Sequence, residues 1–575
     1  MQKQDSTAPD VRRTVIYQLF TRLFGNCNMA NRFNGTIDEN GCGKMNDITA
    51  KALASIRKLG ATHVWYTGII EHATKTDYSQ YDITGDWHDV VKGNAGSPYA
   101  IKDYYDVAPD LAVDVENRIR EFELLVQRTH SEGLQVLIDF VPNHVARRYV
   151  SDVAPEGTVD FGANDKCYVA FAKNNNFYYI PDHSFVSPVK SEEQWQEHPA
   201  KATGNNCFSA SPSENDWYET VKLNYGVDYC GNSVANFNPV PDTWLKMCDI
   251  LLYWCAKGVD GFRCDMAGMV PVEFWHWITG EVRAKYPETI FIAEIYEPER
   301  YFDFIFNGGF DYLYDKMFFY DTVRSIMEGR APASAMTHVW QATEGLHRHL
   351  LYFLENHDEQ RLASDFFLGS ASKAISGMTL VATMFSNPVM LYFGQELGER
   401  GMNCEGFSGT DGRTTIFDYW GLELINEWRN CGAYNNDAMN EESLCLRSFY
   451  ERLLNVINDN EALRSGSFYD LMYANVDNPH FDSSKLFAFL RHTPKQTILV
   501  IVNFADEDVD YKLRLPMDAL RVTGLNSERF FWGLDLLNGS KPVQFPGAVA
   551  LNGGFGGEVK ARGAIIFNIG TGEVR

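Results

Sequence analysis

The sequence lacks the features that define membrane proteins and nucleic-acid-binding proteins: it has no long apolar run and no excess of basic residues. Its most apolar stretches, 378–394 and 497–504, are interrupted by Ser, Thr and Asn or are too short to reach the roughly 18 apolar residues of a membrane span. The 51 Lys and Arg against 76 Asp and Glu give a net charge of −25, which disfavours nucleic acid and acidic membranes as partners. We therefore expect no membrane span and no nucleic-acid partner.

Secretory and disulfide patterns are also missing. The first 13 residues, MQKQDSTAPDVRR, contain no apolar signal segment, although a chain from which a signal had been removed would look the same. The 11 cysteines are odd in number, scattered and without a C-x-x-C pair, a pattern that favours buried thiols in a reducing compartment over a disulfide framework. We expect a cytoplasmic protein.

Short apolar runs alternate with amphipathic stretches over the first two thirds of the chain, the pattern of helices packed on a parallel sheet. The predicted strands are TVIYQLF (14–20), THVWYTGI (62–69), QVLIDFVPNH (135–144), VDGFRCD (259–265), TIFIAEI (289–295), FDYLYD (310–315), LLYFLENHD (350–358) and VMLYFGQE (389–396). Helices are predicted between them, for example over 48–59, 115–129 and 242–257. Eight such units predict an α/β fold, a closed (β/α)₈ TIM barrel.

Two further segments extend the barrel. About 95 residues rich in Asn, Gly, Ser and aromatics, 145–240, follow the third strand, and a plain loop of that length is uncommon. The last third changes to alternating runs such as KLFAFLRH and TILVIVNF, typical of antiparallel strands. We predict a catalytic barrel over 1–144 and 241–462, an inserted lobe over 145–240 and a C-terminal antiparallel β-sandwich domain over 463–575.

Polar side chains end four of the predicted strands. They are Asp139 with Asn143 and His144, Arg263 with Asp265, Glu294, and His357 with Asp358. Functional groups of a parallel barrel lie where its strands end, so these residues are expected to meet at one rim. The segment after the eighth strand, with Gln395, Glu396 and GTDGRT (409–414), is expected either to line the cleft or to form a polar surface turn.

The chemistry of these groups points to glycosidic bond cleavage. Arg263 and Asp265 are two residues apart on one strand face, so the guanidinium is expected to keep Asp265 ionised, as a nucleophile requires. Glu294 ends an apolar run and faces other acids, so we expect a raised pKa, as a general acid requires. Asp358 adds negative potential where an oxocarbenium ion would develop.

Each residue also has a structural interpretation. A single Asp at a strand end is often a helix cap, and a lone histidine such as His144 or His357 is more often a satisfied core or loop residue than a catalytic group. Arg263 alone could be a structural ion pair. The occurrence of four such strand ends in one chain favours the catalytic interpretation.

Four segments, DFVPNH (139–144), GFRCD (261–265), AEIY (293–296) and FLENHD (353–358), resemble the four signature regions of the α-amylase superfamily of glycoside hydrolases in order and in strand position. The resemblance spans nearly the whole chain. It implies that Asp265 is the nucleophile, Glu294 the acid/base and Asp358 the transition-state stabiliser. It further implies that Asp139, His144, Arg263 and His357 support substrate binding and that Tyr99, in GSPY, stacks on the sugar.

The resemblance implies a retaining double displacement, with the carboxyl groups of Asp265 and Glu294 about 5 to 5.5 Å apart. This chain departs from the family at Gly268 and Met269, where α-amylases have Lys-His, and at Ser97, where they have His. The family segment that normally carries an Asp is SVANFNP (233–239) here. Asn143 remains as a candidate ligand should a structural Ca²⁺ site exist, but its acidic and His partners are missing, so we expect no cofactor and no metal site.

Three functions remain open. The first is an α-glucan hydrolase of α-amylase type that cuts α-1,4 links in starch, glycogen or maltooligosaccharides. The second is a transglycosylase or sugar isomerase on the same scaffold, in which a sugar replaces water. The third, a non-catalytic glucan-binding member, is disfavoured because all three carboxylates are present. The sequence leaves substrate length, endo or exo action, α-1,4 against α-1,6 preference and oligomeric state open.

Overall fold

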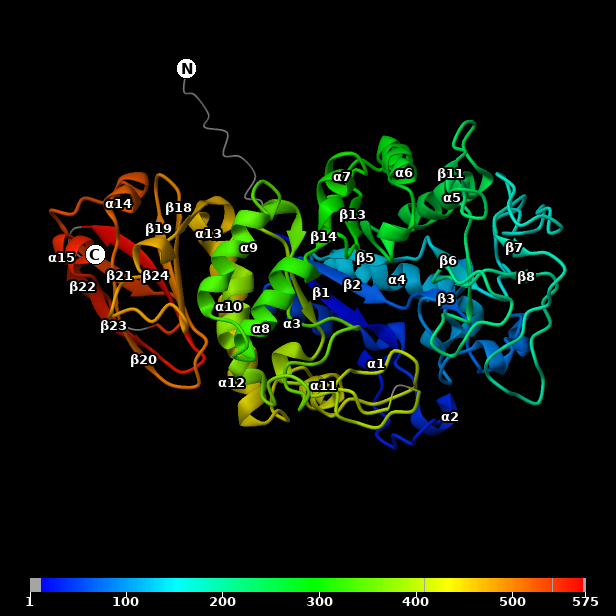
Figure 1. Ribbon diagram of the computed structural model, residues 1–575. Helices are drawn as coiled ribbons and strands as arrows, with labels where there is room; N and C mark the ends of the chain where they lie inside the picture. Colours follow the sequence, from blue (N-terminus) through cyan, green and yellow to red (C-terminus); the bar gives the residue numbers. More distant parts are fainter. Residues whose placement is uncertain (1–11, 408, 540, 572–575) are drawn as a thin grey trace, which may run out of the picture.

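The computed structural model describes residues 12–407, 409–539 and 541–571, and at its centre lies a barrel of parallel strands (Figure 1). The barrel strands are β1 (Val15–Phe20), β2 (His63–Thr67), β5 (Gln135–Phe140), β12 (Gly261–Cys264), β13 (Ile290–Ala293), β14 (Tyr312–Tyr314), β15 (Leu350–Leu351) and β16 (Val389–Tyr392). Their order is β15-β14-β13-β12-β5-β2-β1-β16, and a parallel bridge between Tyr352 and Val389 joins the two ends. The predicted closed (β/α)₈ barrel is confirmed.

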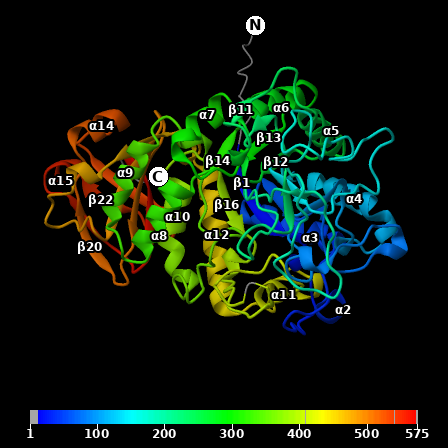
Figure 2. The same cartoon turned by 45° about the vertical axis from the view of Figure 1, so that its right-hand side comes forward.

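Helices surround the barrel, as Figure 2 shows for α3, α4, α5 and α6. The helices of this part of the chain are α1 (Thr21–Phe24), α2 (Ile37–Asn40), α3 (Ala50–Leu59), α4 (Arg118–Ser131), α5 (Asp242–Ala256), α6 (Val272–Lys285), α7 (Tyr301–Phe306), α8 (Asp321–Met327), α9 (Met336–Ala342), α10 (Ile375–Thr383), α11 (Glu423–Arg429), α12 (Glu441–Asp459) and α13 (Glu461–Ser465). Strands β1 and β2 are buried at every position because helices cover one face and the barrel interior the other.

Local sequence signals set the ends of α3. The Thr49 side chain accepts a hydrogen bond from the backbone N–H of Ala52 and so caps the helix start. Gly60 ends it with φ at +115°, and a Cβ there would lie 2.7 Å from the Cβ of Leu454 on α12. Both the backbone angle and the close helix contact therefore require glycine.

Short antiparallel pairs lie in the segments that follow β2 and β5. Strands β3 (Ile70–His72) and β4 (Ile101–Val107) pair between β2 and α4. The chain between β5 and α5 contains β6 (His144–Ala146) paired with β9 (Thr220–Lys222), β7 (Tyr179–Ile180) with β8 (Ala200–Lys201), and β10 (Val227–Asp228) with β11 (Val234–Ala235). The predicted lobe boundaries of 145–240 stay a prediction.

The C-terminal part forms an antiparallel domain on the opposite side of the barrel from these pairs (Figure 1). One sheet has the order β17 (Ser467–Asp470), β18 (Leu486–His492), β19 (Thr497–Asn503), β24 (Ala564–Thr571), β21 (Phe530–Asp535) and β22 (Val543–Pro546). A second sheet pairs β20 (Val509–Leu513) with β23 (Phe555–Val559), and α14 (Met517–Thr523) and α15 (Gly547–Asn552) complete the domain. The predicted antiparallel β domain is confirmed.

All 11 cysteines lie in the described part of the chain and are free. Only Cys248, Cys255 and Cys264 are buried, so the interpretation of the cysteines as buried thiols is wrong for most of them, since they lie on loops and helix surfaces. No helix of the described residues is long and apolar enough to cross a membrane. The cytoplasmic assignment stays a prediction.

Candidate active site

Adjacent barrel strands deliver the central charged side chains to one rim. Arg263 on β12 is in register with Asp139 on β5, and Asp265 follows the last residue of β12. Glu294 follows the last residue of the neighbouring strand β13. Because the carboxyl ends of neighbouring parallel strands share an edge, the three acids converge on Arg263.

Arg263 contacts both predicted catalytic carboxylates. Its Nη1 donates a hydrogen bond of 2.6 Å to Oδ1 of Asp265, and its Nη2 forms an ion pair of 2.9 Å with Oε1 of Glu294. Asp139 lies further away, 3.9 Å from Nη1. The guanidinium is 1% exposed and is held over the rings of Trp65, Tyr99 and Tyr314. A single fixed cation therefore sets the spacing of the two acids.

Burial raises the pKa of Asp265 and of Glu294, and Arg263 opposes the rise at both. The expectation that Arg263 keeps Asp265 ionised stays a prediction: the guanidinium lowers the pKa of Asp265, but burial outweighs it and raises the pKa overall. The raised pKa predicted for Glu294 is confirmed, and the charge of Asp265 adds to the effect of burial there. The charge of Asp265 is therefore one cause that favours the protonated form of Glu294.

Two contacts that the sequence analysis missed orient Glu294. The backbone N–H of Met266 donates to Oε2 at 2.7 Å, and the Tyr296 hydroxyl donates to Oε1 at 2.6 Å. Met266 adopts left-handed backbone angles, φ 44° and ψ 40°, which are uncommon for a residue with a side chain and occur at functional sites. Tyr296 could have been predicted from the sequence, because side chains two residues apart in an extended segment point to the same face.

Replacing Tyr296 by Phe tests this orientation. The hydroxyl stabilises the ionised form of Glu294, so its removal should raise the pKa of Glu294 further. A general acid works only while protonated, so activity should persist to higher pH. We expect the basic limb of the kcat/KM profile to move up by about one pH unit, the size of one hydrogen bond to a charged group. A basic limb that stays in place or moves down would contradict this role.

His357 is a neutral hydrogen-bonding group rather than a cation. Burial, then the charge of Arg263, lowers its pKa well below the ordinary value. Gln18 on β1 donates to Nδ1 at 2.8 Å, which leaves the proton on Nε2 facing the Tyr99 hydroxyl at 2.6 Å. The Tyr99 ring stacks on His357 at 5.1 Å. Gln18 was missed, although a polar residue inside the apolar strand TVIYQLF was a usable signal.

Asp358 is the most exposed of the three catalytic candidates, with 44% of its side chain accessible. The strand predicted over 350–358 covers only Leu350–Leu351. Further along, Asn356 makes a turn in which its Oδ1 accepts from the backbone N–H groups of Asp358 and Glu359. This turn places Oδ2 of Asp358 3.1 Å from Nε2 of His357. Burial of part of the side chain, and then the negative charge of Glu294, raises the pKa of Asp358 to about 7.

One cavity of about 250 Å³ brings most of the predicted residues together. The predicted residues that line it are Tyr99, His144, Asp265, Glu294, His357 and Asp358. Asp139 and Arg263 do not line the cavity but are buried beside it, where Arg263 contacts both Asp139 and Asp265. The carboxylates thus surround a common space, as the glycosidase interpretation requires.

Several cavity residues were missed by the sequence analysis. They are Lys92, Trp217, Glu219, Thr220, Met266, Tyr296, Ile416 and Phe417, and Ser97, noted above as a departure from the family, also lines the cavity. Trp217 packs on His144 with ring centroids 5.2 Å apart, and burial lowers the pKa of His144 to about 3, so this histidine is neutral. Most of the missed residues lie in long loops, where no strand-end pattern marks them.

The segment after the eighth strand reaches the cavity through Ile416 and Phe417 rather than through Gln395 or Glu396. Glu396 is buried and accepts hydrogen bonds from Tyr17 at 2.8 Å and from Arg447 at 2.9 Å. It therefore ties α12 to the barrel, and the expectation that Gln395 and Glu396 line the cleft is wrong.

The position of the expected calcium ligand does not suit a divalent cation. The Oδ1 of Asn143 accepts a hydrogen bond from Nζ of Lys222, a side chain that is 2% exposed. The same Nζ lies 3.5 Å from the carbonyl oxygen of Met269. Calcium prefers several hard oxygens, whereas here the amino group of Lys222, whose pKa burial lowers to about 7, already occupies the space beside Asn143. The residues present do not fit Ca²⁺.

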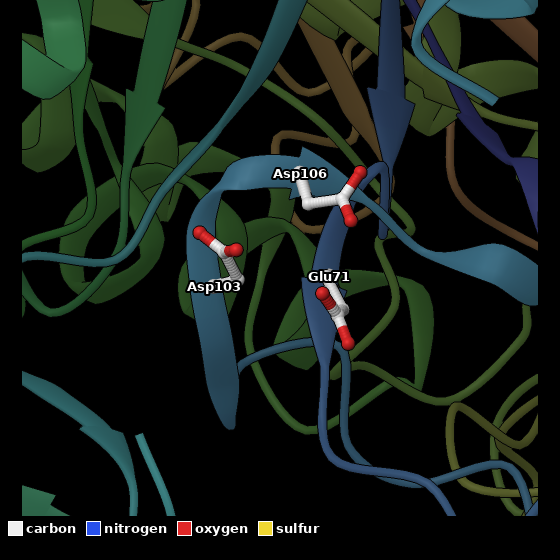
Figure 3. Close-up of side chains that lie close together, drawn as sticks. All are labelled: Glu71, Asp103 and Asp106. Atoms are coloured by element: carbon white, nitrogen blue, oxygen red, sulfur yellow. The ribbon is translucent and has the colours of Figure 1, made fainter. Parts of the chain in front are cut away.

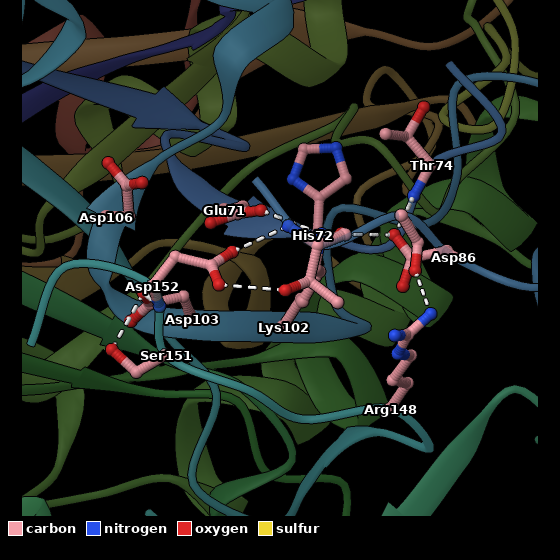
Figure 4. Close-up of polar contacts among 12 residues, drawn as sticks. Glu71, His72, Thr74, Asp86, Lys102, Asp103, Asp106, Arg148, Ser151 and Asp152 are labelled. Carbon is pink, nitrogen blue, oxygen red and sulfur yellow. Dashed lines mark hydrogen bonds and ion pairs between the residues drawn. The ribbon is translucent and has the colours of Figure 1, made fainter. Parts of the chain in front are cut away.

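A separate group of three carboxylates, Glu71, Asp103 and Asp106, lies on β3 and β4 (Figure 3). It is the one group of three or more His, Cys, Asp or Glu with metal-ligand spacing found among the described residues. Protein groups already contact it: Lys102 forms an ion pair of 3.1 Å with Glu71, and the Ser151 hydroxyl donates to Asp103 at 2.8 Å (Figure 4).

Arg118 further binds Asp106 through Nε at 2.8 Å. Burial raises the pKa of Glu71 well above its ordinary value, and the charge of Lys102 opposes this rise. A metal would have to displace Lys102 and Arg118 from their carboxylates. We therefore interpret the group as the anchor of the β3–β4 pair to residues 151–153.

A (β/α)₈ barrel with paired acids on one arginine in a cavity at its rim defines a glycoside hydrolase. Residues 18–464 match the family model described as "Alpha amylase, catalytic domain", so the chain belongs to the α-amylase family.

Relatives of several activities resemble the chain at low identity. "Alpha-amylase 2" of Dictyoglomus thermophilum is 21% identical over 510 residues, which cover 87% of this chain and 71% of that protein. The "Cyclomaltodextrinase" of Thermoanaerobacter pseudethanolicus is 22% identical and covers 85% and 70%. "Neopullulanase 2" of Thermoactinomyces vulgaris is 21% identical and covers 89% and 72%.

A solved structure with the same architecture is the noncanonic maltogenic alpha-amylase AmyB from Thermotoga neapolitana. It is 19% identical, has a TM-score of 0.61 and covers 97% of this chain and 99% of that one. AmyP in complex with maltose is 16% identical with a TM-score of 0.63 and covers 96% of each chain. These likenesses support the shared fold.

Proposed function

We propose that the protein is a retaining α-glucan hydrolase that cleaves α-1,4-glucosidic bonds in starch, glycogen or maltooligosaccharides. The observation that carries the proposal is the contact of one guanidinium, Arg263, with both Asp265 and Glu294. Two carboxyl groups bound to neighbouring nitrogens of one group lie close together, as a retaining pair must. Asp358 lines the same cavity and supplies negative charge toward the sugar.

In the first step Glu294 donates its proton to the glycosidic oxygen while the Asp265 carboxylate attacks the anomeric carbon. The bond to the leaving sugar breaks, and that sugar departs as an alcohol. The Met266 N–H and the Tyr296 hydroxyl hold both oxygens of Glu294 in fixed positions, so the proton is delivered in one direction.

In the second step Glu294, now ionised, removes a proton from a water molecule that attacks the same carbon. The bond to Asp265 breaks and the carboxylate is restored on Arg263, which stabilises its charge as it forms. Two inversions at one carbon give net retention. Asp358 stabilises the positive charge on the ring in both transition states.

Product analysis on maltoheptaose tests hydrolysis against transfer. Hydrolysis gives only products shorter than the substrate, whereas a transglycosylase gives longer ones. A time course on amylose, followed by chromatography, then measures action on long chains. Products longer than maltoheptaose at early times would favour the alternative in which a sugar resolves the intermediate, and a product of unchanged mass would favour an isomerase.

We further propose that activity does not depend on calcium, because Lys222 takes the position beside Asn143. EDTA and added Ca²⁺ should leave the Tm and the activity of the wild-type protein unchanged. Lys222→Met leaves the buried Oδ1 of Asn143 without this donor, at a cost of about 1–3 kcal/mol, and should lower the Tm by a few degrees. Lys166→Met, at an exposed position of the inserted segment, is the control and should not. A wild-type Tm that falls in EDTA would contradict the proposal.

A further inference from the structure

A buried ion pair closes the segment of residues 355–361, here called the Asp358 loop. Oε2 of Glu355 lies 2.9 Å from Nη1 of Arg361, and the two side chains are 1% and 0% exposed. The other carboxylate oxygen of Glu355, Oε1, accepts from the backbone N–H of Leu362 at 2.6 Å. The two ends of the loop are therefore tied to each other, and Asp358 lies at its middle.

Arg361 also ties the Asp358 loop to a barrel strand. Its Nη1 donates to the carbonyl oxygen of Phe393, directly after β16, at 2.9 Å. Its guanidinium lies over the ring of Tyr392, the last residue of β16, 4.1 Å from the ring centroid. Because β16 pairs with β1 in the barrel, these contacts fix the loop relative to the other strands that carry site residues.

The same arginine holds a second segment of the cavity wall. Its Nε donates to Oγ1 of Thr414 at 2.8 Å, and its backbone N–H donates to the carbonyl oxygen of Gly412 at 2.7 Å. Ile416 and Phe417, which follow shortly after Thr414, line the catalytic cavity. A guanidinium can make its contacts with separate segments at once because its nitrogens are fixed in one plane.

Asp358 has few contacts of its own that could position it. Among the described residues, the one hydrogen bond or ion pair found for its carboxylate is the contact of 3.1 Å with Nε2 of His357, a residue of the same loop. The direction of the carboxylate therefore depends on the backbone of the Asp358 loop. A displacement of about 1 Å in a reacting geometry can lower a rate about 100-fold.

We propose that Arg361 is a positioning residue that, together with Glu355, holds the Asp358 loop so that the Asp358 carboxylate faces the sugar in the cavity. This inference rests on the proposed function, in which Asp358 stabilises positive charge on the sugar ring. Arg361 is not among the described residues that line the cavity, so it acts through Asp358 and not by contact with the substrate.

The test removes both partners at once, as Glu355→Gln with Arg361→Met, because the loss of one partner would leave an unpaired buried charge. Gln can still accept from the Leu362 N–H. Since Asp358 acts in the transition state, we expect kcat on maltoheptaose to fall about 10- to 100-fold, with KM within about threefold of the wild type.

A second buried ion pair supplies the matched control. Arg447 and Glu396 lie 2.9 Å apart, with side chains 6% and 0% exposed, and neither is among the described residues that line the cavity. Glu396→Gln with Arg447→Met should therefore keep kcat within about twofold of the wild type, since effects at separate sites are independent.

Combination with Asp358→Asn separates positioning from a general structural effect. If the Glu355 and Arg361 substitutions act through Asp358, adding them to Asp358→Asn should lower kcat by less than about threefold further, because residues that act as a unit are not additive. A further loss as large as in the wild-type background would overturn the proposal. An unchanged kcat in the variant without the Glu355–Arg361 pair would also overturn it.

Arg361→Lys keeps the proposal testable if the variant without the pair does not fold. Lysine keeps a charge beside Glu355 but has no second nitrogen for Thr414, so this variant should show the same non-additive loss of kcat. A wild type that does not cleave maltoheptaose, or an Asp358→Asn enzyme with full activity, would instead refute the proposed function on which this inference rests.

Discussion

Glu294→Gln should reduce kcat on maltooligosaccharides by at least about 1,000-fold while leaving the Tm near that of the wild type. General acid–base catalysis contributes roughly 10²- to 10⁴-fold, and here one residue serves both steps, so the loss should lie toward the upper end. Gln keeps the shape of the side chain: its amide oxygen can accept from the Met266 N–H, and its amide NH2 can donate to the Tyr296 hydroxyl. Steady-state kinetics with thermal unfolding checks the prediction.

The choice of leaving group separates a lost proton donor from a general defect. Maltosyl fluoride needs little proton transfer to its leaving group, so its cleavage should suffer much less in the first step than that of maltotriose. Glu299→Gln, at an exposed acid five residues on, should behave like the wild type. An active Glu294→Gln enzyme on maltotriose would refute the acid/base assignment.

Asp265→Gly should be equally inactive, because no carboxylate remains to attack the anomeric carbon. The loss expected is at least about 1,000-fold, as for other enzymes without their nucleophile. Removing the side chain also opens a space beside Arg263, whose uncompensated charge attracts small anions.

Azide is the informative addition to Asp265→Gly. It should enter that space, attack maltosyl fluoride from the side that Asp265 occupied and give a maltosyl azide of inverted configuration. Azide should not accelerate the wild type. If azide restores activity but the product has retained configuration, the assignment of Asp265 as the nucleophile is contradicted.

Much of the barrel was predictable because its strands are buried on both faces and read as continuous apolar runs. The chain 135–140 forms β5 within the predicted 135–144, and 389–392 forms β16 within 389–396. The seventh strand is limited to Leu350–Leu351, and the chain before Asp358 contains a turn at Asn356 that apolar periodicity does not reveal. Strand existence was therefore more predictable than strand length.

The candidate catalytic acids could be selected from the sequence for a related reason: Asp265 and Glu294 directly follow apolar strands, and Asp358 follows an apolar run at a greater distance. Their pKa values were less predictable, because the burial that raises the pKa of Asp265 depends on how the folded chain packs around it. Lys92, Trp217 and Glu219 come from irregular segments, and only the folded chain brings them to the cavity.

The central claim, that Asp265 forms a covalent bond to the sugar, is tested most directly by mass spectrometry of the trapped intermediate. Glu294→Gln incubated with maltosyl fluoride can form this intermediate but lacks the base that would release it. We predict a protein heavier by one maltosyl group, with the added mass on the peptide that contains Asp265. A protein of unchanged mass, or an added sugar on any other peptide, would contradict the account.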